Sequence, residues 1–339
     1  MAGRSPGRMP HARLVPALLA TLLGGCTMEQ YPQTTLSPQS DYAWSIQRLL
    51  EQQVFWVVVI FVGVLLATLF IVLRFRARPG APEPKHIHGH TALEIAWTIA
   101  PAVILTLVAI PTVSTIYRTQ APPPPNALTV RAIGHQWWWE FQYPELGVTT
   151  ASEMVVPVGR PVSVHIETAD VLHSFWFPAM GGKRDAVPGR VNRIFFTAER
   201  PGEYPGQCAE LCGVSHANMR MRLDVRTPQD FDAWVAAQKA GPVEPAAASL
   251  AARGKDVFRA SACIGCHTVT GIAAGVIGPN LTHVGSRYAI AGGIYPNTPE
   301  NLGHWISDPP ARKPGSLMPK LGLPPDQVEA LTAYLSSLK

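Results

Sequence analysis

The chain carries little charge for its length. Asp, Glu, Lys and Arg make up only 15% of its 339 residues, whereas hydrophobic residues make up 47%. The basic residues form no long run, and without Arg4, Arg8 and Arg13 near the start the formal net charge falls from +5 to +2. Nucleic-acid binding requires a concentrated basic surface. This composition therefore excludes nucleic acid as a partner and favours membrane content instead.

Cysteine is also scarce. The chain has five cysteines, and each belongs to one of three short motifs: Cys26, Cys208, Cys212, Cys263 and Cys266. The sequence contains no carboxylate pair and no Ser/His/Asp set that indicates bond-making catalysis. Its chemistry is therefore expected from metal and cofactor ligands, and its length allows more than one domain.

Residues 1–25 predict an export signal, in which basic residues precede the short apolar run "LVPALLATLLGGC". The run is too short to span a bilayer. Its end, "LGGC", resembles a bacterial lipoprotein signal, with cleavage before Cys26 and lipid on its thiol. The alternative is an ordinary signal peptide in which Cys26 is incidental. Both interpretations put the water-soluble parts outside the cytoplasm.

Two uncharged runs, residues 54–73 and 95–117, predict a transmembrane hairpin within residues 36–118. Twenty helical residues at about 1.5 Å each span roughly 30 Å, the thickness of a hydrocarbon core. The alternative is a pair of buried helices in a large soluble core. The connecting loop has four basic residues, so the positive-inside rule puts the loop in the cytoplasm: Arg74, Arg76, Arg78 and Lys85.

The pattern changes after the hairpin. Residues 127–239 contain short alternating stretches broken by Pro and Gly, which predict a small all-β sandwich or barrel closed by a short helix. Residues 240–249 are a linker by composition. Residues 250–339 begin and end with helical periodicity around a Gly/Pro-rich middle. The predicted fold class is therefore a multidomain membrane protein with a two-helix hairpin, an all-β domain and an all-α domain.

The stretch "GQCAELCGVSHANM" combines two cysteines, a histidine and a methionine with the spacing C-x3-C-x3-H-x2-M. A disulfide, a buried helix face and a soft-metal site all fit this spacing. A helix would separate the outer side chains by roughly 16 Å, so a shared metal requires a curled loop, which Pro205, Gly206 and Gly213 favour. Thiolate, imidazole and thioether ligands select copper, whereas a thioether is a poor zinc ligand. Two cysteines suit two bridged copper ions, and His173 offers a second imidazole.

The stretch "CIGCH" is the attachment pattern of a c-type haem, with Cys263 and Cys266 bonding the haem and His267 as axial ligand. The alternatives are a disulfide and a chance match. Met318 is the only methionine in this module and is predicted as the opposite axial ligand. His283 and His304 are its rivals.

Longer motifs carry a family resemblance. "LEIAWTIAPAV", "GHQWWWEF", "DVLHSFWFP", "DAVPGR" and "PGEYPGQCAELCGVSHANM" resemble subunit II of the haem–copper cytochrome c oxidases over about residues 36–235. Residues 250–339 resemble a class I cytochrome c. The resemblance implies a two-helix transmembrane hairpin, a cupredoxin-like sandwich with the binuclear CuA centre, and a fused all-α cytochrome c domain.

The resemblance also implies residue roles. Trp137 is where electrons enter the copper centre, and Glu94 lies at the mouth of a proton path into subunit I. The Glu210 side chain helps to bind a magnesium ion shared with subunit I. The implied copper ligands, with Glu210 acting through its backbone carbonyl, are His173, Cys208, Glu210, Cys212, His216 and Met219.

We therefore expect the electron-input subunit of a terminal oxidase in the bacterial inner membrane, with both soluble domains on the outer face. Its expected partners are subunit I, other oxidase subunits, membrane lipid and a reduced cytochrome c or similar donor. Oxygen reduction and proton pumping would take place in subunit I. The alternatives are the CuA subunit of a nitric oxide reductase and a membrane copper carrier. Nitrous oxide reductases share the copper motif but are soluble.

Overall fold

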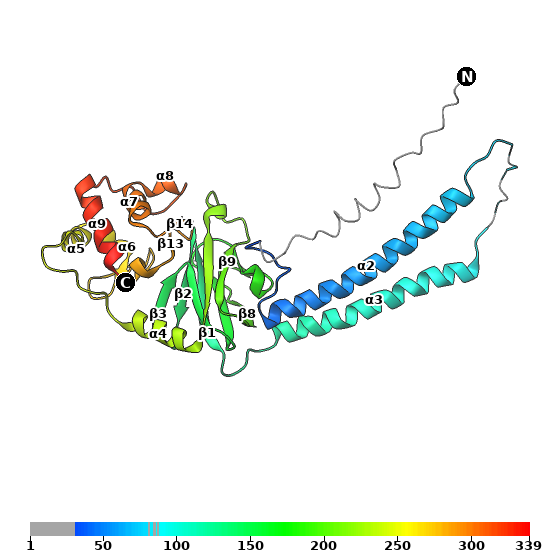
Figure 1. Cartoon of the computed structure of the whole chain (residues 1–339), viewed down its shortest axis with the longest axis horizontal. Helices are drawn as coiled ribbons and strands as arrows, with labels where there is room; N and C mark the ends of the chain where they lie inside the picture. Colours follow the sequence, from blue (N-terminus) through cyan, green and yellow to red (C-terminus); the bar gives the residue numbers. More distant parts are fainter. Residues whose placement is uncertain (1–30, 81, 84–85, 87) are drawn as a thin grey trace, which may run out of the picture.

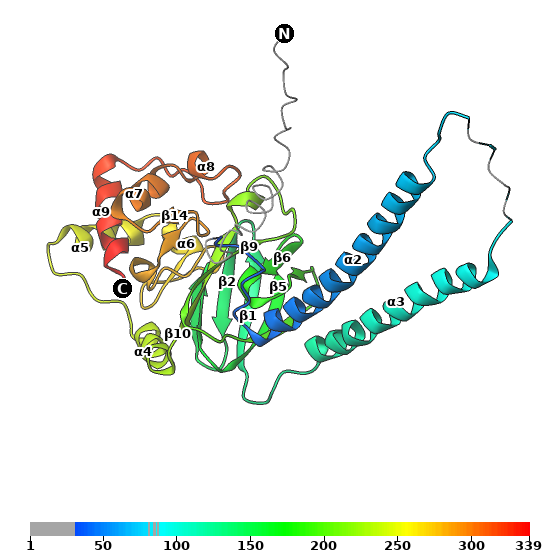
Figure 2. The same ribbon diagram turned by 45° about the vertical axis from the view of Figure 1, so that its right-hand side comes forward.

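A computed structural model describes residues 31–80, 82–83, 86 and 88–339. The predicted export signal, Cys26 and Lys85 lie outside the described residues. Three parts follow one another along the long axis of the molecule: a helical hairpin, a β-sandwich and a mainly helical C-terminal domain (Figure 1). The hairpin and the C-terminal domain lie on opposite sides of the sandwich (Figures 1 and 2).

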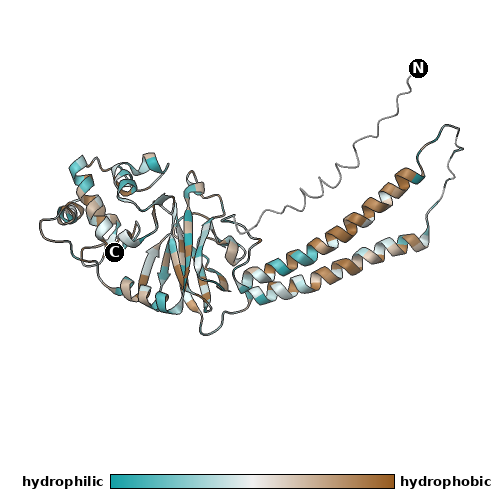
Figure 3. Ribbon diagram, viewed as in Figure 1, coloured by the Kyte–Doolittle hydropathy of each residue, from teal (hydrophilic) through white to brown (hydrophobic). Residues whose placement is uncertain are grey.

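The hairpin consists of helices α2 (Asp41–Arg74) and α3 (Thr91–Gln120). By length and composition both are apolar enough to span a membrane, and the hydropathy colouring shows the apolar stretch of α2 away from the sandwich (Figure 3). Both helices extend beyond the predicted runs, 54–73 and 95–117. At about 1.5 Å per residue, the 34 residues of α2 reach roughly 51 Å, more than a hydrocarbon core of about 30 Å.

The extra turns of α2 are polar and fastened to the sandwich. Ser40 caps the helix by accepting a hydrogen bond from the Ala43 amide, and its hydroxyl donates to the Met180 carbonyl over 2.7 Å. The Asp41 carboxylate accepts from the Thr197 amide, also over 2.7 Å. These tertiary contacts explain why α2 begins well before its apolar run.

The β-sandwich confirms the predicted all-β domain. One five-stranded sheet has the order β3-β2-β1-β5-β8 and the other β4-β10-β9-β6-β7. The β1–β5 and β4–β10 pairs are parallel, and the remaining pairs are antiparallel. The strands are β1 (Leu128–His135), β2 (Trp138–Tyr143), β3 (Val148–Ala151), β4 (Glu153–Pro157), β5 (Pro161–Thr168), β6 (His173–Trp176), β7 (Arg184–Ala186), β8 (Asn192–Thr197), β9 (Gly202–Cys208) and β10 (Arg220–Arg226).

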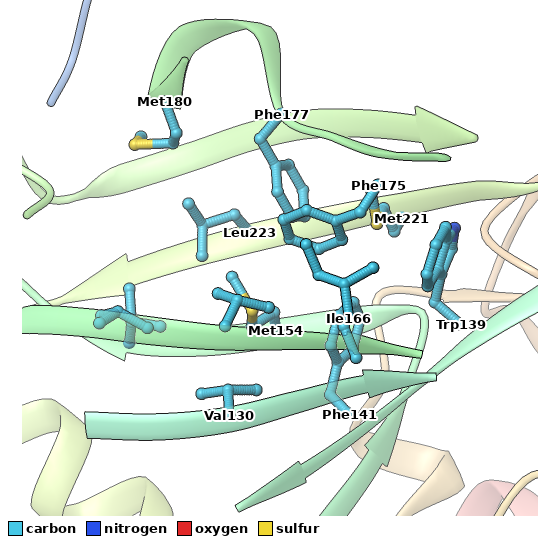
Figure 4. Close-up of a cluster of buried hydrophobic side chains, with 14 of the residues drawn as sticks. Val130, Trp139, Phe141, Met154, Ile166, Phe175, Phe177, Met180, Met221 and Leu223 are labelled. Atoms are coloured by element: carbon cyan, nitrogen blue, oxygen red, sulfur yellow. The ribbon is translucent and has the colours of Figure 1, made fainter. Parts of the chain in front are cut away.

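Alternating side chains of both sheets meet in one core (Figure 4). Strand β1 alternates buried and half-buried residues along its whole length, as a half-solvated strand does. Trp139 and Phe141 of β2 each lie edge-on to Phe175 of β6, with ring centroids 5.7 and 6.4 Å apart. This aromatic layer packs beside the end of the sandwich where β6 begins at His173 and β9 ends at Cys208.

Helix α4 (Pro228–Lys239) follows the last strand, and residues 241–246 have no regular structure before α5. In the C-terminal domain α5 crosses α9 so closely that a Cβ on Gly254 would lie 1.9 Å from the Ala330 carbonyl oxygen. Phe258 and Tyr334 fill the core between these helices. The helices are α5 (Leu250–Ala260), α6 (Cys263–Cys266), α7 (Pro299–Ser307), α8 (Pro309–Arg312) and α9 (Pro325–Ser337).

Short elements complete the chain. Two small hairpins in the C-terminal domain pair β11 with β12 and β13 with β14. These strands and the 3-10 helices are η3 (Pro178–Met180), η4 (His216–Asn218), β11 (Thr268–Val269), β12 (Ala273–Ala274), η5 (Val284–Ser286), β13 (Ala289–Ile290) and β14 (Tyr295–Pro296).

Candidate copper and haem sites

The metal-ligand motif forms the connection between β9 and β10. Cys208 is the last residue of β9, and Met219 directly precedes β10. The Cys208 amide donates to the Met219 carbonyl over 2.9 Å, which closes the loop at its base. The predicted curled loop is therefore present, and the alternative of one amphipathic helix through the motif is wrong.

The side chains of this loop converge on a small volume. The Cys208 and Cys212 sulfurs lie 3.8 Å apart, far beyond the roughly 2.0 Å of a disulfide, so both thiols are free. The Cys212 sulfur lies 3.5 Å from His216 Nδ1 and 3.8 Å from the Met219 sulfur. The Glu210 carbonyl oxygen lies 3.3 Å from the Cys208 sulfur.

His173 joins the cluster from the start of β6 on the same sheet. Its Nδ1 lies 3.8 Å from the Cys208 sulfur. The ligand atoms of His173, Cys208 and Cys212 all lie within 4.8 Å of one another, and all three residues are buried. The second imidazole predicted from the sequence is thus near enough to share a metal with the cysteines.

The two thiols perturb each other. Their mutual hydrogen bond is the main cause that lowers the pKa of Cys208 to about 3, and the same contact raises the pKa of Cys212. The pair therefore favours one thiolate and one thiol that share a proton. A soft cation that binds both sulfurs would displace the remaining proton, because metal ligands bind in their deprotonated form.

Asp170 orients His173, a role that the sequence analysis did not identify. Its carboxylate lies 2.7 Å from His173 Nε2, so this nitrogen is engaged and Nδ1 faces the sulfurs. Burial by itself lowers the pKa of His173, but the hydrogen bonds and charges of Asp170 and Cys208 together outweigh it, and the pKa is raised. On the other side of the ring, a Cβ on Gly134 would lie 2.7 Å from His173 Cδ2. The imidazole is thus fixed from two directions.

This donor set fits copper. Two free thiols, two imidazoles and a thioether suit copper; His173, Cys208, Cys212 and Met219 are buried, and His216 is half-buried beside them. No carboxylate oxygen belongs to the donor cluster of the described residues. A hard cation such as Ca²⁺ or Mg²⁺ would prefer oxygen ligands. The chemistry of the residues therefore agrees with a copper centre.

Trp137 lies in the turn between β1 and β2, directly above the metal-ligand loop. Its indole Nε1 donates to the Cys212 carbonyl over 3.0 Å, and the side-chain amide of Gln136 donates to the same oxygen. Trp139, in contrast, is fully buried in the sandwich core. The first of the three consecutive tryptophans is therefore the one that contacts the metal-ligand loop.

The "CIGCH" motif forms α6 and the residue that follows it. The His267 imidazole has its Nδ1 2.8 Å from the Pro279 carbonyl, which leaves Nε2 for another partner. A Cβ on Gly278 would lie 2.5 Å from His267 Cε1, and one on Gly275 would lie 2.6 Å from the Cys266 backbone. Only glycine allows the chain to approach the motif this closely.

One cavity collects the predicted haem ligands. Cys263, Cys266, His267 and Met318 all line it, together with Trp137 from the sandwich. The rival ligands do not line it: His283 contacts the Gln238 carbonyl in another cavity, and His304 is exposed on α7. The residues therefore fit a c-type haem held between His267 and Met318.

Glu94 lies far from both sites, in the first turn of α3 at the distal end of the hairpin (Figure 1). Its carboxylate accepts a hydrogen bond from the His90 amide. The structure thus brings together the predicted copper ligands, Trp137 and the predicted haem ligands, and it does not bring Glu94 to them.

The fold and these donor sets define a class: a membrane-anchored redox protein with a copper-type loop in a cupredoxin-like sandwich and a fused cytochrome c domain. Three family models match the chain, described as the transmembrane domain of cytochrome c oxidase subunit II (residues 26–115), the periplasmic domain of the same subunit (146–225) and cytochrome c (251–339).

Two bacterial relatives match almost the full length. Cytochrome c oxidase subunit 2 of Alkalihalophilus pseudofirmus is 41% identical over 97% of both chains. That of Bacillus subtilis is 32% identical over 96% of this chain and 97% of its own. The solved periplasmic domain of cytochrome oxidase subunit II from Bradyrhizobium japonicum is 38% identical, covers 34% of this chain and 96% of its own, and superposes with a TM-score of 0.33.

The chain belongs to the cytochrome c oxidase subunit II family and carries a C-terminal cytochrome c domain. It is thus a subunit of a cytochrome c oxidase, as predicted. The full-length relatives bear the oxidase name, which gives no support to the alternatives of a nitric oxide reductase subunit or a copper carrier.

Proposed function

We propose that this chain is the electron-input subunit of its oxidase, receiving electrons at the C-terminal domain and delivering them through the copper domain to subunit I. The observation that carries the proposal is the cavity of the predicted haem ligands, because Trp137 lines it and also donates to the Cys212 carbonyl of the metal-ligand loop. Two redox sites that share one contacting residue suit electron transfer rather than bond-making chemistry.

In this proposal the copper domain holds two copper ions through its convergent loop. The residues that would hold the ions are Cys208, Cys212, His173 and His216, with Met219 and the Glu210 carbonyl as weaker ligands. When bound, the copper and haem groups would supply one-electron redox chemistry. Burial of His173, Cys208, Cys212 and Met219 excludes water from their side of the site, and Asp170 fixes the His173 ring.

The C-terminal domain holds the haem through residues that are already oriented. Cys263 and Cys266 would supply the sulfurs of the two thioether bonds. Nδ1 of His267 is held by the Pro279 carbonyl, which leaves Nε2 for the haem. Met318 lines the same cavity, and its thioether would be the soft ligand that raises the redox potential of the haem. A reduced cytochrome c or similar soluble protein is the proposed donor.

The remaining roles concern the membrane. By the positive-inside rule, Arg74, Arg76 and Arg78 support a cytoplasmic hairpin loop, which would leave both soluble domains on the outer face of the bacterial inner membrane. Glu94 would then lie at the cytoplasmic end of α3, at the mouth of a proton path into subunit I. The Glu210 side chain would help to hold a magnesium ion shared with subunit I, where oxygen is reduced and protons are pumped.

The proposal is tested by purifying the chain with its partner subunits. We expect a mixed-valence copper signal in absorption and electron paramagnetic resonance, covalent haem, and oxygen uptake driven by reduced cytochrome c. Copper that a chelator removes readily, with no mixed-valence signal, would indicate a carrier and contradict the proposal.

A reciprocal pair of variants tests whether the two sites are separate. Cys212→Ser removes one bridging ligand, so we expect the copper signal to disappear and the haem band to remain. Cys263→Ser removes one thioether sulfur, and we expect an unchanged copper signal. Loss of the haem band in a folded, exported Cys212→Ser protein would refute this separation.

A further inference from the structure

Lys313 is an unusual residue at the junction of the two soluble domains. It follows α8 in the C-terminal domain and is only 3% exposed. Its ammonium donates to the Trp137 carbonyl of the copper domain over 2.5 Å and to the Ala291 carbonyl of its own domain over 2.7 Å. Among the ion pairs of the described residues, none includes Lys313. Two neutral carbonyls therefore hold a buried charge.

Such a charge is costly unless its acceptors are fixed in place. Burial lowers the pKa of Lys313 to about 7, since the charged form loses its hydration. In an undocked C-terminal domain the ammonium would keep only the Ala291 carbonyl and reach water. One of the two acceptors that make its burial tolerable thus belongs to the other domain.

Two glycines of the C-terminal domain lie close against Trp137, Gly292 at its carbonyl and Gly315 at its ring. A Cβ on Gly292 would lie 2.4 Å from the Trp137 carbonyl oxygen, and one on Gly315 would lie 2.7 Å from the Trp137 ring. Both have positive φ angles of +77°. The two loops therefore enclose Trp137, with Lys313 next to it.

Further hydrogen bonds cross the junction beside Lys313. The Arg220 amide donates to the Gly292 carbonyl over 2.9 Å, and the Ser215 hydroxyl donates to the Pro314 carbonyl over 2.6 Å. The Glu153 carboxylate accepts from the Tyr288 amide. These contacts describe a seated interface, whereas the ten-residue linker between α4 and α5 would by itself give only a high local concentration.

We propose that Lys313 is a positioning residue that clamps the C-terminal domain onto Trp137, so that the predicted haem cavity and the metal-ligand loop share a fixed contact. The clamp acts on the backbone of the very residue whose side chain contacts the Cys212 carbonyl. The inference rests on the proposed function in one respect, namely that electrons pass from haem to copper across this junction.

Amide hydrogen exchange on the purified oxidase tests the clamp directly. Lys313→Met keeps the length of the side chain and removes the charge. Because the variant loses two charge-assisted hydrogen bonds, the junction opens more often. We therefore expect the Arg220 and Tyr288 amides to exchange about ten- to a hundredfold faster. Amides inside β5 are expected to stay protected. The matched control is Lys320→Met, since Lys320 is an exposed lysine of the same domain paired with Asp308.

A second variant opens the junction without changing the lysine. Gly292→Ala puts a methyl group against the Trp137 carbonyl, and we expect the same amides to lose protection. Gly271→Ala is its control, because Gly271 has the same φ of +77° and no atom within 4 Å of its would-be Cβ. Equal exchange in the two glycine variants would contradict a seated interface.

Electron transfer supplies the readout that a purely structural lysine would not move. After flash reduction of the haem, we expect transfer to copper in Lys313→Met to slow by about tenfold, with both absorption spectra retained. Lys313 also lines the predicted haem cavity, so both potentials are measured in the variant and the slowing is expected to exceed what their change accounts for. Unchanged amide exchange or an unchanged transfer rate, in a protein that contains both centres, would overturn the clamp. A wild-type protein without copper or haem signals would instead overturn the proposed function, and the exchange data would still report on the clamp.

Discussion

The two ring nitrogens of His173, at the start of β6, have different partners. His173 has its Nε2 held by Asp170, which leaves Nδ1 for the sulfur side. Asp170 is itself anchored, since it accepts hydrogen bonds from the backbone amides of Gln136 and Val171. The ring therefore has one orientation before any metal binds, which lowers the cost of metal binding.

We expect Asp170→Asn to weaken copper binding about ten- to a hundredfold, because partners of this kind orient the metal ligand and raise its basicity. Competition with a copper chelator measures the affinity. Asp185→Asn is the control, since Asp185 is an exposed acid on the neighbouring strand β7. Equal affinities in the two variants would show that Asp170 does not support the site.

Met219→Leu is expected to retain copper but to shift its reduction potential and slow oxidation of the donor, because a weak axial ligand tunes a site more than it holds it. Spectroelectrochemistry measures the potential. Met221→Leu is a matched control, since Met221 lies in the sandwich core two residues further on. An unchanged potential in Met219→Leu would mean that Met219 is not a ligand.

At the residue scale, the sequence indicated which donors could converge in the metal-ligand loop because they are close in the chain and chemically distinctive, and the structure brings those side chains together. Spacing alone could not identify Asp170, since an Asp three residues before a His is an ordinary pattern. Nor could it show that Lys313 is buried, because one of its two acceptors, the Trp137 carbonyl, lies 176 residues away in the sequence.

At the scale of elements, the haem motif depends on glycines that bring a loop against α6. Gly278 leaves room for the His267 ring, and a Cβ there would lie 2.5 Å from Cε1. That overlap cannot be relieved without moving the imidazole or the loop, which also supplies the Pro279 carbonyl that orients the ring.

Gly278→Ala is therefore expected to lower covalent haem content and to alter the absorption that reports axial ligation. The measurement is haem per chain together with the visible spectrum. Gly265→Ala serves as the control inside the motif itself, because no atom lies within 4 Å of its would-be Cβ. Normal haem content and spectrum in Gly278→Ala would contradict the close approach.

Most helices and strands formed where the hydrophobic periodicity of the sequence predicted them. The alternating stretches became β1, β5, β8 and β10, and the helical stretch after the sandwich became α4. The transmembrane helices were longer than their apolar runs because contacts with the sandwich, such as that between Asp41 and the Thr197 amide, extend α2 toward the N-terminus. Periodicity reports which face of an element is buried, but not where tertiary contacts begin or end it.

At the scale of the whole molecule, the domains form a line from the hairpin through the copper domain to the cytochrome c domain (Figure 2). The junction between the soluble domains buries Trp137. Under the proposed function, a soluble donor would meet the C-terminal domain first, because Trp137, the electron-entry residue implied by the family resemblance, is buried against that domain.

Stopped-flow absorbance with reduced cytochrome c tests this order of electron transfer most directly. We expect the haem band to be reduced before copper. We also expect Met318→Ala to lower the haem potential and to slow both haem reduction and oxygen uptake, while the copper spectrum stays normal. Reduction of copper before haem, at a rate that Met318→Ala does not change, would contradict this order and make the cytochrome c domain an accessory.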